Sequence, residues 1–123
     1  MSQIPKRFQK FTEDYPNVAK AYEQLGDAVH QSGPLDEKTR ALIKLAISTG
    51  ARLEGAVHSH ARKALKVGCT VEEMRQVALL SLPTIGLPSM MAALSWIDDI
   101  IENKKWYWII WLLIRQKTEN EII

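Results

Sequence analysis

Helix-terminating residues divide this 123-residue chain into short segments, and inside each segment the apolar residues recur at helical spacing. The breaks are Ser32-Gly33-Pro34, Thr49-Gly50-Ala51, Gly68 and the stretch from Pro83 to Pro88. No segment alternates apolar and polar residues with period two, the pattern of a half-buried strand. The sequence therefore predicts an all-α protein, a bundle of about five to six helices whose short connections make neighbours antiparallel or steeply crossed.

Residues 1–13 are expected to form a lead-in to the first helix. Asp14 is suited to be its N-cap and Pro16 to lie in its first turn, and the helix is predicted to continue to about Gln31. Its apolar stripe consists of Val18, Tyr22, Leu25 and Val29.

Two central helices are predicted between residues 37 and 68. The first begins at Glu37, after Asp36 as cap, and continues to about Ser48 with so few polar positions that it should be central. The second lies between Gly50 and Gly68. Its apolar residues gather on one side of a helical wheel and are Leu53, Ala56, Val57, Ala61, Ala64, Leu65 and Val67.

Two more helices are predicted after Gly68. Thr70 and Glu73 have the spacing of a capping box, which predicts a helix beginning at Val71. Its apolar residues are Met74, Val77, Ala78, Leu80 and Leu82. Leu87-Pro88 opens the last helix, whose apolar stripe is Met91, Leu94, Ile97 and Ile101 and whose solvent side is Asp98, Asp99 and Glu102.

A single domain is expected over residues 1–103, followed by an apolar, aromatic extension over residues 104–123. The run Trp106–Ile114 is too short to span a bilayer, which takes about 20 residues. Three interpretations of this run stay open: a helix buried in a subunit interface, a strand or helix packed on its own core, or an interfacial membrane anchor. Each of them favours self-association, because such a surface would otherwise aggregate.

Composition excludes several function classes. A net charge of +2 from 16 basic and 14 acidic residues leaves no basic face for nucleic acid. Cys69 is the single cysteine, so an internal disulfide or two-thiol redox centre is impossible, which fits a reducing compartment. Residues 1–10 are polar and basic and do not resemble a secretory signal, so a cytoplasmic location is expected.

The segment from Gly50 to Gly68 holds the residues best suited to chemistry. On the helical wheel His60 lies in the middle of the apolar stripe, whereas Glu54, which looks buried, and His58 share its flank one turn apart. His60 is therefore either a core histidine bonded to a backbone carbonyl or an acid/base catalyst. Glu54 and His58 are either a half-exposed pair or part of a site.

A metal site is disfavoured on this segment alone. His58 and His60 point about 200° apart on a regular helix, so they cannot bind the same ion. Glu54 and His58 would need one or two further ligands from elsewhere, for which His30, Asp98 and Asp99 are candidates by residue type alone. We accordingly expect neither a metal nor a cofactor.

An ordered series of short motifs resembles the carboxymuconolactone decarboxylase family, which includes the AhpD-type alkylhydroperoxidases. The series begins with Leu35-Asp36-Glu37-Lys38-Thr39-Arg40 and continues through Glu54 and through His60 with Gly68 eight residues later. It ends with Thr70-Val71-Glu72-Glu73 and Gly86-Leu87-Pro88, followed by Ala92 and Ala93. The resemblance implies an all-α fold built into trimers or hexamers. The residues from 104 onward lie outside it.

The resemblance implies one of two chemistries. Peroxidase relatives use two cysteines in a C-x-x-C motif, but Leu53 and Ala56 occupy those positions here, so thiol peroxidase activity is not expected. Decarboxylase relatives act on a carboxylated lactone without a metal or organic cofactor, and their glutamate and histidine correspond to Glu54 and His60. Where that branch carries a histidine and a tyrosine, this chain has Leu80 and Thr84.

The resulting hypothesis is cofactor-free proton transfer on a small carboxylated, lactone-like molecule. His60 would be the general acid/base and Glu54 would set its tautomer or pKa. His58 would support this pair or contact substrate, and Arg52 would bind a carboxylate. The alternative is a non-catalytic ligand-binding or scaffold member in which Glu54 and His60 satisfy each other across a subunit interface.

Overall fold

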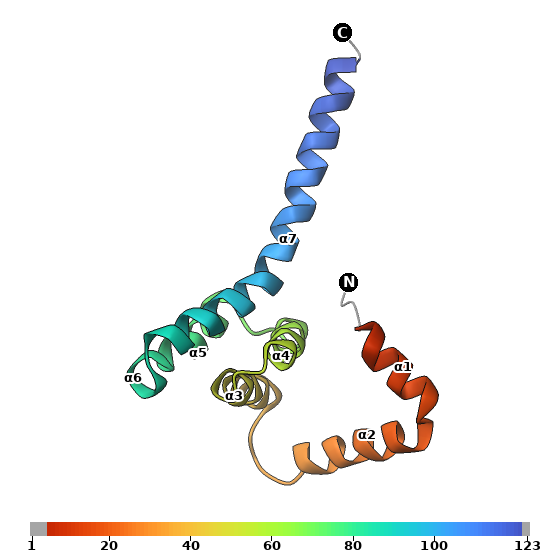
Figure 1. The fold of residues 1–123 in the computed structure, drawn as a ribbon, viewed down its shortest axis with the longest axis vertical. Coiled ribbons are helices and arrows are strands. Elements are labelled where there is room, and N and C mark those ends of the chain that lie inside the picture. The colour runs from red at the N-terminus through yellow and green to blue at the C-terminus, as the bar shows by residue number, and fades with distance from the viewer. Residues whose placement is uncertain (1–4, 122–123) are drawn as a thin grey trace. The chain divides into compact units, whose positions relative to one another are not determined.

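A computed structural model describes the backbone of residues 5–121 and the side chains of residues 5–102 and 112–117. Within residues 5–121 it contains seven helices and no strand (Figure 1). The helices are α1 (Lys6–Asp14), α2 (Pro16–His30), α3 (Glu37–Gly50), α4 (Glu54–Lys66), α5 (Val71–Leu80), α6 (Leu82–Ile85) and α7 (Leu87–Glu121). The prediction of an all-α fold is confirmed.

The chain divides into two compact units, Met1–Asp36 and Glu37–Ile123. In the first unit α1 packs against α2. In the second, α4 packs against both α3 and α7, and α5 packs against α7 and α3. The residues singled out for chemistry belong to the second unit: Glu54, His58 and His60 are on α4, and Arg52 lies in the turn before it.

Helix α1 occupies a stretch that was expected to be a lead-in. The rings of Phe8 and Phe11 lie 6.2 Å apart between centroids, and those of Phe11 and Tyr15 lie 6.1 Å apart, the side-by-side placement that spacings of three and four residues give on a helix. Because α1 extends to Asp14, that residue is not the N-cap of α2; Tyr15 is, and it makes no side-chain cap. Pro16 lies in the first turn of α2 as predicted.

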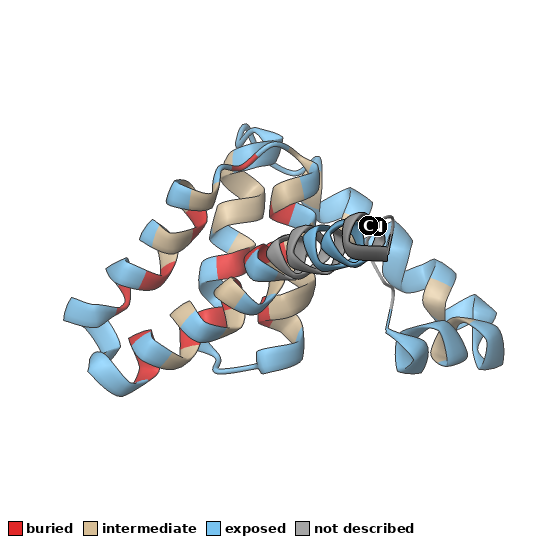
Figure 2. Cartoon of the chain, turned by 90° about the horizontal axis from the view of Figure 1, so that it is seen from above, coloured by how far each residue is buried: buried red, intermediate tan, exposed pale blue. Residues whose placement is uncertain are grey.

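The apolar stripe predicted for α2 is present, and its side chains are exposed. None of the residues of α1 or α2 is buried (Figure 2). The large exposed apolar side chains of α2 are Val18, Tyr22, Leu25 and Val29. Helical spacing thus predicted the helix and its apolar face correctly without indicating what packs on that face.

The core lies in the second unit, at the contacts of α3, α4, α5 and α7. Its buried residues are Leu45, Val57, Ala61, Ala64, Cys69, Met74, Ala78, Ala93, Ile97 and Ile101. Small residues such as Ala61, Ala64 and Ala78 let the helices approach closely, and the largest fully buried side chains, Leu45 and Met74 among them, fill the space between them. As predicted, α3 is central: it contacts α4, α5 and α7.

The turn between α3 and α4 lies two residues later than predicted. Thr49 and Gly50 are still helical, and the break is Ala51–Leu53. The amide of Leu53 donates to the carbonyl of Ser48 at 3.2 Å and that of Arg52 to Thr49 at 3.1 Å, which is the Schellman arrangement at a helix C-terminus. It requires a positive φ at Arg52, which has φ +59°.

The end of α4 has the same arrangement with glycine in the strained position. Cys69 donates its amide to Ala64 at 2.9 Å and Gly68 to Leu65 at 3.1 Å. Gly68 has φ +92°, a conformation that glycine adopts without steric cost. The prediction that Gly68 terminates this helix is confirmed.

Helix α5 begins with the predicted capping box. Thr70 Oγ1 accepts from the Glu73 amide at 3.0 Å, and Glu73 Oε1 accepts from the Thr70 amide at 2.8 Å. Lys38 of α3 lies 3.4 Å from the same carboxylate oxygen. Met74 and Ala78 are buried as predicted, but Leu80 and Leu82 are exposed because α5 ends at Leu80 and the short helix α6 follows.

Helix α7 is continuous for 35 residues from Leu87 to Glu121. Residue 104, where the apolar extension was expected to start, lies inside this backbone helix. The side chains of residues 106–111 lie outside the described set, while Leu112, Leu113 and Ile114 are exposed. Among the described residues, no helix combines the length and apolarity needed to cross a membrane.

Candidate functional site

Helix α4 carries candidate residues on two different sides. Leu53 is extended and Glu54 is the first helical residue, where a carboxylate is favoured by the exposed amides of the first turn. Glu54 is exposed, contrary to its appearance in the sequence, because no preceding turn of helix covers this position. Val57, Ala61 and Ala64 are buried and fix the rotation of α4 in the core.

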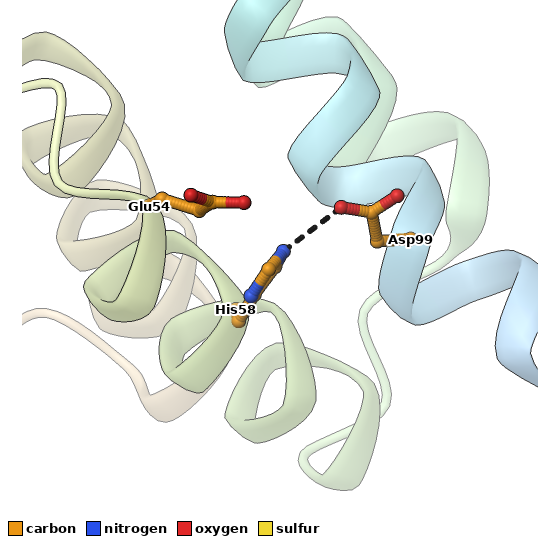
Figure 3. Close-up of side chains that lie close together, drawn as sticks. All are labelled: Glu54, His58 and Asp99. Carbon is orange, nitrogen blue, oxygen red and sulfur yellow. Dashed lines mark hydrogen bonds and ion pairs between the residues drawn. The ribbon is translucent and has the colours of Figure 1, made fainter.

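The side of α4 that faces α7 brings three ligand-type residues together. His58 Nε2 lies 3.0 Å from Asp99 Oδ2, a hydrogen bond between helices that becomes an ion pair when the imidazole is protonated. Glu54, one turn before His58, extends toward the same place (Figure 3). One nitrogen or oxygen atom from each of Glu54, His58 and Asp99 lies within 4.8 Å of the others.

The acid next to Asp99 has a different partner. Asp98 Oδ1 accepts from Arg75 Nε at 3.0 Å, which joins α7 to α5. Asp98 is partly buried and Asp99 is exposed, as follows from their positions one residue apart on α7. Two adjacent acids therefore serve two different helix contacts.

His60 lies on another side of α4, about 200° around the helix from His58. Partial burial lowers the pKa of the imidazole, and the positive charges of Lys63 and Lys44 lower that pKa further. Burial likewise lowers the pKa of the Lys44 ammonium, with added repulsion from Lys63 and Arg40. His60 is half-buried rather than fully packed in the core.

The four predicted site residues thus separate in the folded chain. Glu54 and His58 lie together with Asp99, whereas the charged neighbours of His60 are Lys63 and Lys44. Arg52 is exposed in the turn before α4, where its positive φ serves the end of α3. The predicted pairing of Glu54 with His60 stays a prediction. It concerns a contact between two subunits.

The sequence did not place two neighbours of the candidate residues, Asp99 and Lys44. Asp99 was predicted only as a solvent-side residue of α7 and as a ligand by residue type, and Lys44 was not singled out at all. Their positions depend on the packing of α7 and α3 against α4, which helical periodicity does not contain.

Leu53, which is exposed, and Ala56, which is half-buried, occupy the positions where the resemblance described above implies the two cysteines of peroxidase relatives. Cys69 is buried, and its Sγ lies 3.8 Å from the carbonyl oxygen of Lys38. A buried thiol is poorly placed to attack a peroxide. The described site therefore offers acid, base and cationic groups rather than a thiol pair.

Comparison with known proteins gives a family. The profile of the carboxymuconolactone decarboxylase family matches residues 16–99. A crystal structure of a carboxymuconolactone decarboxylase family protein from Legionella pneumophila superposes with a TM-score of 0.68 at 26% sequence identity, covering 78% of this chain and 86% of that one.

Two curated relatives are uncharacterized proteins. One, from Methanocaldococcus jannaschii, is 30% identical over 89 residues, which is 72% of this chain and 86% of the relative. The other, from Haemophilus influenzae, is 38% identical over 63 residues, 51% of this chain and 56% of the relative. The match thus spans just over half the length of the Haemophilus protein.

Proposed function

Since this chain belongs to the carboxymuconolactone decarboxylase family, we propose that it catalyses cofactor-free proton transfer on a small carboxylated, lactone-like molecule, with decarboxylation as the leading reaction. The observation that carries the proposal is His60, half-buried on α4 beside the cationic side chains of Lys44 and Lys63. A fully packed histidine would have favoured a purely structural role instead.

This arrangement matches the needs of the reaction. Loss of carbon dioxide requires that the substrate carboxylate be held and that a proton be delivered to the carbon it leaves. Lys44 and Lys63 supply positive charge from two helices, α3 and α4, and so favour an anionic substrate near the His60 ring. His60 is the group that transfers the proton, in accord with its correspondence to the family's histidine.

The remaining predicted residues have supporting roles in this proposal. Arg52, exposed before α4, adds positive charge at the entrance to the helix and assists capture of an anion. Glu54 acts on His60 only where a second subunit brings the two together, because within one chain its carboxylate lies beside His58 and Asp99.

We also propose that the protein works as a homo-oligomer in a reducing, cytoplasmic setting. The α2 stripe is exposed, and large apolar residues of the second unit are exposed as well. These are Ile43, Ile47, Leu53, Leu79, Leu80, Leu82, Ile85, Leu87, Met91, Leu112, Leu113 and Ile114. So much apolar surface is typical of an interface, and a second copy of the chain fits the trimers or hexamers of the family.

The test is turnover of a panel of five-membered lactones that carry a carboxylate on the ring, followed by carbon dioxide release and ultraviolet absorbance. His60→Gln should lower kcat by at least about 100-fold, the scale of a lost proton-transfer group. Lys44→Met should raise KM roughly tenfold or more, because a charge-assisted contact to the carboxylate is removed.

His30→Gln, in the first unit, is the matched control and should leave both constants unchanged. Unchanged kcat in His60→Gln would refute the assignment of the proton-transfer group. Absence of both turnover and saturable binding across the panel would refute the proposed substrate class.

A further inference from the structure

We propose that Glu54, His58 and Asp99 form a binding site for a divalent transition-metal ion, with Zn²⁺ as the representative ligand. The site lies on the side of α4 that faces α7, whereas His60 lies on another side of the same helix. It goes beyond the proposed proton-transfer function, and neither depends on the other.

The three donor atoms are close to a coordinating arrangement already. His58 Nε2 and Asp99 Oδ2 are 3.0 Å apart, and a carboxylate oxygen of Glu54 completes a set within 4.8 Å. Zinc bonds of about 2.0–2.2 Å to nitrogen and oxygen place neighbouring ligand atoms about 3–3.5 Å apart. Small rotations of the exposed Glu54 and Asp99 side chains therefore suffice to close the set around one ion.

The backbone positions of these ligands are fixed by the core. His58 directly follows Val57, and Asp99 comes two residues after Ile97, and both of these apolar side chains are completely buried where α4 and α7 pack. Glu54 is placed one helical turn before His58, so that its carboxylate and the imidazole extend side by side toward Asp99 (Figure 3). The sequence left the Glu54–His58 pair short of a third ligand, and the packing of α7 supplies it.

Charge is the second observation that points to a cation. Two carboxylates converge on a single imidazole, whereas the neighbouring Asp98 is matched by Arg75 at 3.0 Å. Within residues 5–102, no lysine or arginine forms an ion pair with Glu54 or Asp99. A divalent ion would offset the repulsion between the two carboxylates.

The donor types indicate the class of ion. One imidazole nitrogen and two carboxylate oxygens suit Zn²⁺ and its first-row neighbours better than Mg²⁺, which favours oxygen ligands alone. Three protein ligands leave at least one coordination position for water. The side chains of His58 and Asp99 are 25% and 56% exposed, so an ion can enter from solvent without unfolding of the helices.

The experiment is a calorimetric titration of the full-length, chelator-treated protein with Zn²⁺, with Mg²⁺ as the comparison ion. One Zn²⁺ per chain should bind with a dissociation constant in the micromolar range or below, and Co²⁺ should give visible absorption bands of an ion with nitrogen and oxygen ligands. His58→Ala and Asp99→Asn should each weaken Zn²⁺ binding by at least tenfold, while circular dichroism confirms that they remain folded.

Asp98→Asn is the matched control, because it removes the adjacent acid without touching the three ligands. It should leave Zn²⁺ affinity unchanged. The proposal is overturned if the wild-type chain binds no stoichiometric Zn²⁺, or if Asp98→Asn weakens binding as much as Asp99→Asn does. Turnover of lactones plays no part in either readout, so this site and the proposed function can fail separately.

Discussion

The two units of this chain are built from helices with equally clear periodicity, yet among the described residues the buried core cluster lies entirely in the second unit. In α2 the stripe that includes Tyr22 and Leu25 is exposed, whereas the stripes of α3, α4, α5 and α7 interlock around residues such as Leu45 and Met74. Periodicity thus specifies a helix and its apolar face. The partner of that face is a separate property, which depends on tertiary or quaternary packing.

The ends of α3, α4 and α5 also differ from those of the first unit, although α4 and α6 begin without a side-chain cap. Neither α1 nor α2 has a side-chain cap at its N-terminus. In the second unit, α5 begins with a complete capping box, and both α3 and α4 end in Schellman turns. Local and tertiary signals agree there, so those helices are stable for two reasons, while α2 depends on what covers its stripe.

The largest expected effect is in the core of the second unit. Leu45→Ala removes a completely buried side chain between helices and should lower the free energy of unfolding by about 2–5 kcal/mol. Urea denaturation measures it, and the loss should be the same at every protein concentration. A loss below about 1 kcal/mol would show that this core is not close-packed.

A charge in the α2 stripe should act on assembly instead. Leu25→Asp places a carboxylate on an exposed apolar face and should raise the concentration needed for half-assembly by at least tenfold, with helix content preserved. Sedimentation analysis gives the mass, and Lys20→Asp in the same helix is the control for added charge. If the mass of Leu25→Asp equals that of the wild type, the stripe is not covered by a second copy.

The next largest effect is expected from removal of a threonine hydroxyl, which should cost more stability at the cap of α5 than within α1. Thr70→Ala removes one half of the capping box and should cost about 1 kcal/mol of unfolding free energy. Thr12→Ala, in α1, removes an exposed hydroxyl that bonds only to the Gln9 carbonyl, and should change stability by less than about 0.5 kcal/mol. Chemical denaturation measures the free energy of unfolding of both variants. Equal losses would show that the capping box contributes no more than the Thr12 hydrogen bond.

The two Schellman turns allow a pair of substitutions with opposite expected effects on stability. Arg52→Gly relieves a positive φ at a residue with a Cβ atom and should raise stability by about 0.5–1 kcal/mol. Gly68→Ala imposes the same strain and should lower stability by about 1 kcal/mol, although no atom crowds the added methyl group. Thermal unfolding reports both signs, and a stability loss in Arg52→Gly would mean that the arginine side chain makes a stabilising contact.

The smallest effect is electrostatic. Hydrogen bonds from the Thr70 backbone amide and side chain, together with the charge of Lys38, lower the pKa of Glu73. A carboxylate with a lowered folded-state pKa stabilises the protein above its ordinary pKa, and this contribution disappears as the pH falls through the folded-state value. The melting temperature of Glu73→Gln should therefore lie below wild type near pH 7 and approach it near pH 3.

Glu72→Gln is the control for this measurement, since Glu72 lies in the same turn outside the capping box. Its difference from wild type should be smaller than that of Glu73→Gln near pH 7. A constant difference between Glu73→Gln and wild type over the whole pH range would show that the carboxylate charge is irrelevant to the cap.

Much of this fold could be predicted from local signals. Thr70 with Glu73, Pro16 and Gly68 each marked a helix end that the structure confirms, because capping and proline chemistry act within one turn. Helix α1 was missed although Phe8 and Phe11 have helical spacing. The turn after α3 was placed too early, because Arg52 rather than Gly50 adopts the left-handed conformation.

The candidate site was predictable only in part, for a physical reason. The wheel separated His58 from His60 and placed Glu54 beside His58, which depends on one helix alone. That Asp99 faces His58 at 3.0 Å, and that Lys44 lies near His60, depends on how α7 and α3 pack on α4. Contacts of this kind follow from the core as a whole, not from any single segment.

Because α7 is one continuous helix, the position of each residue around the helix axis is fixed relative to every other residue of that helix. Asp99 and the residues beyond 103 belong to one helix, so inserting a single residue after Glu102 would rotate everything C-terminal to it by about 100° and leave Asp99 in place. Inserting seven residues would restore the rotation to within about 20° and shift the end outward by about 10 Å. The packing of α7 against α4 around His58 therefore fixes both the direction and the distance of the last turns of the helix backbone.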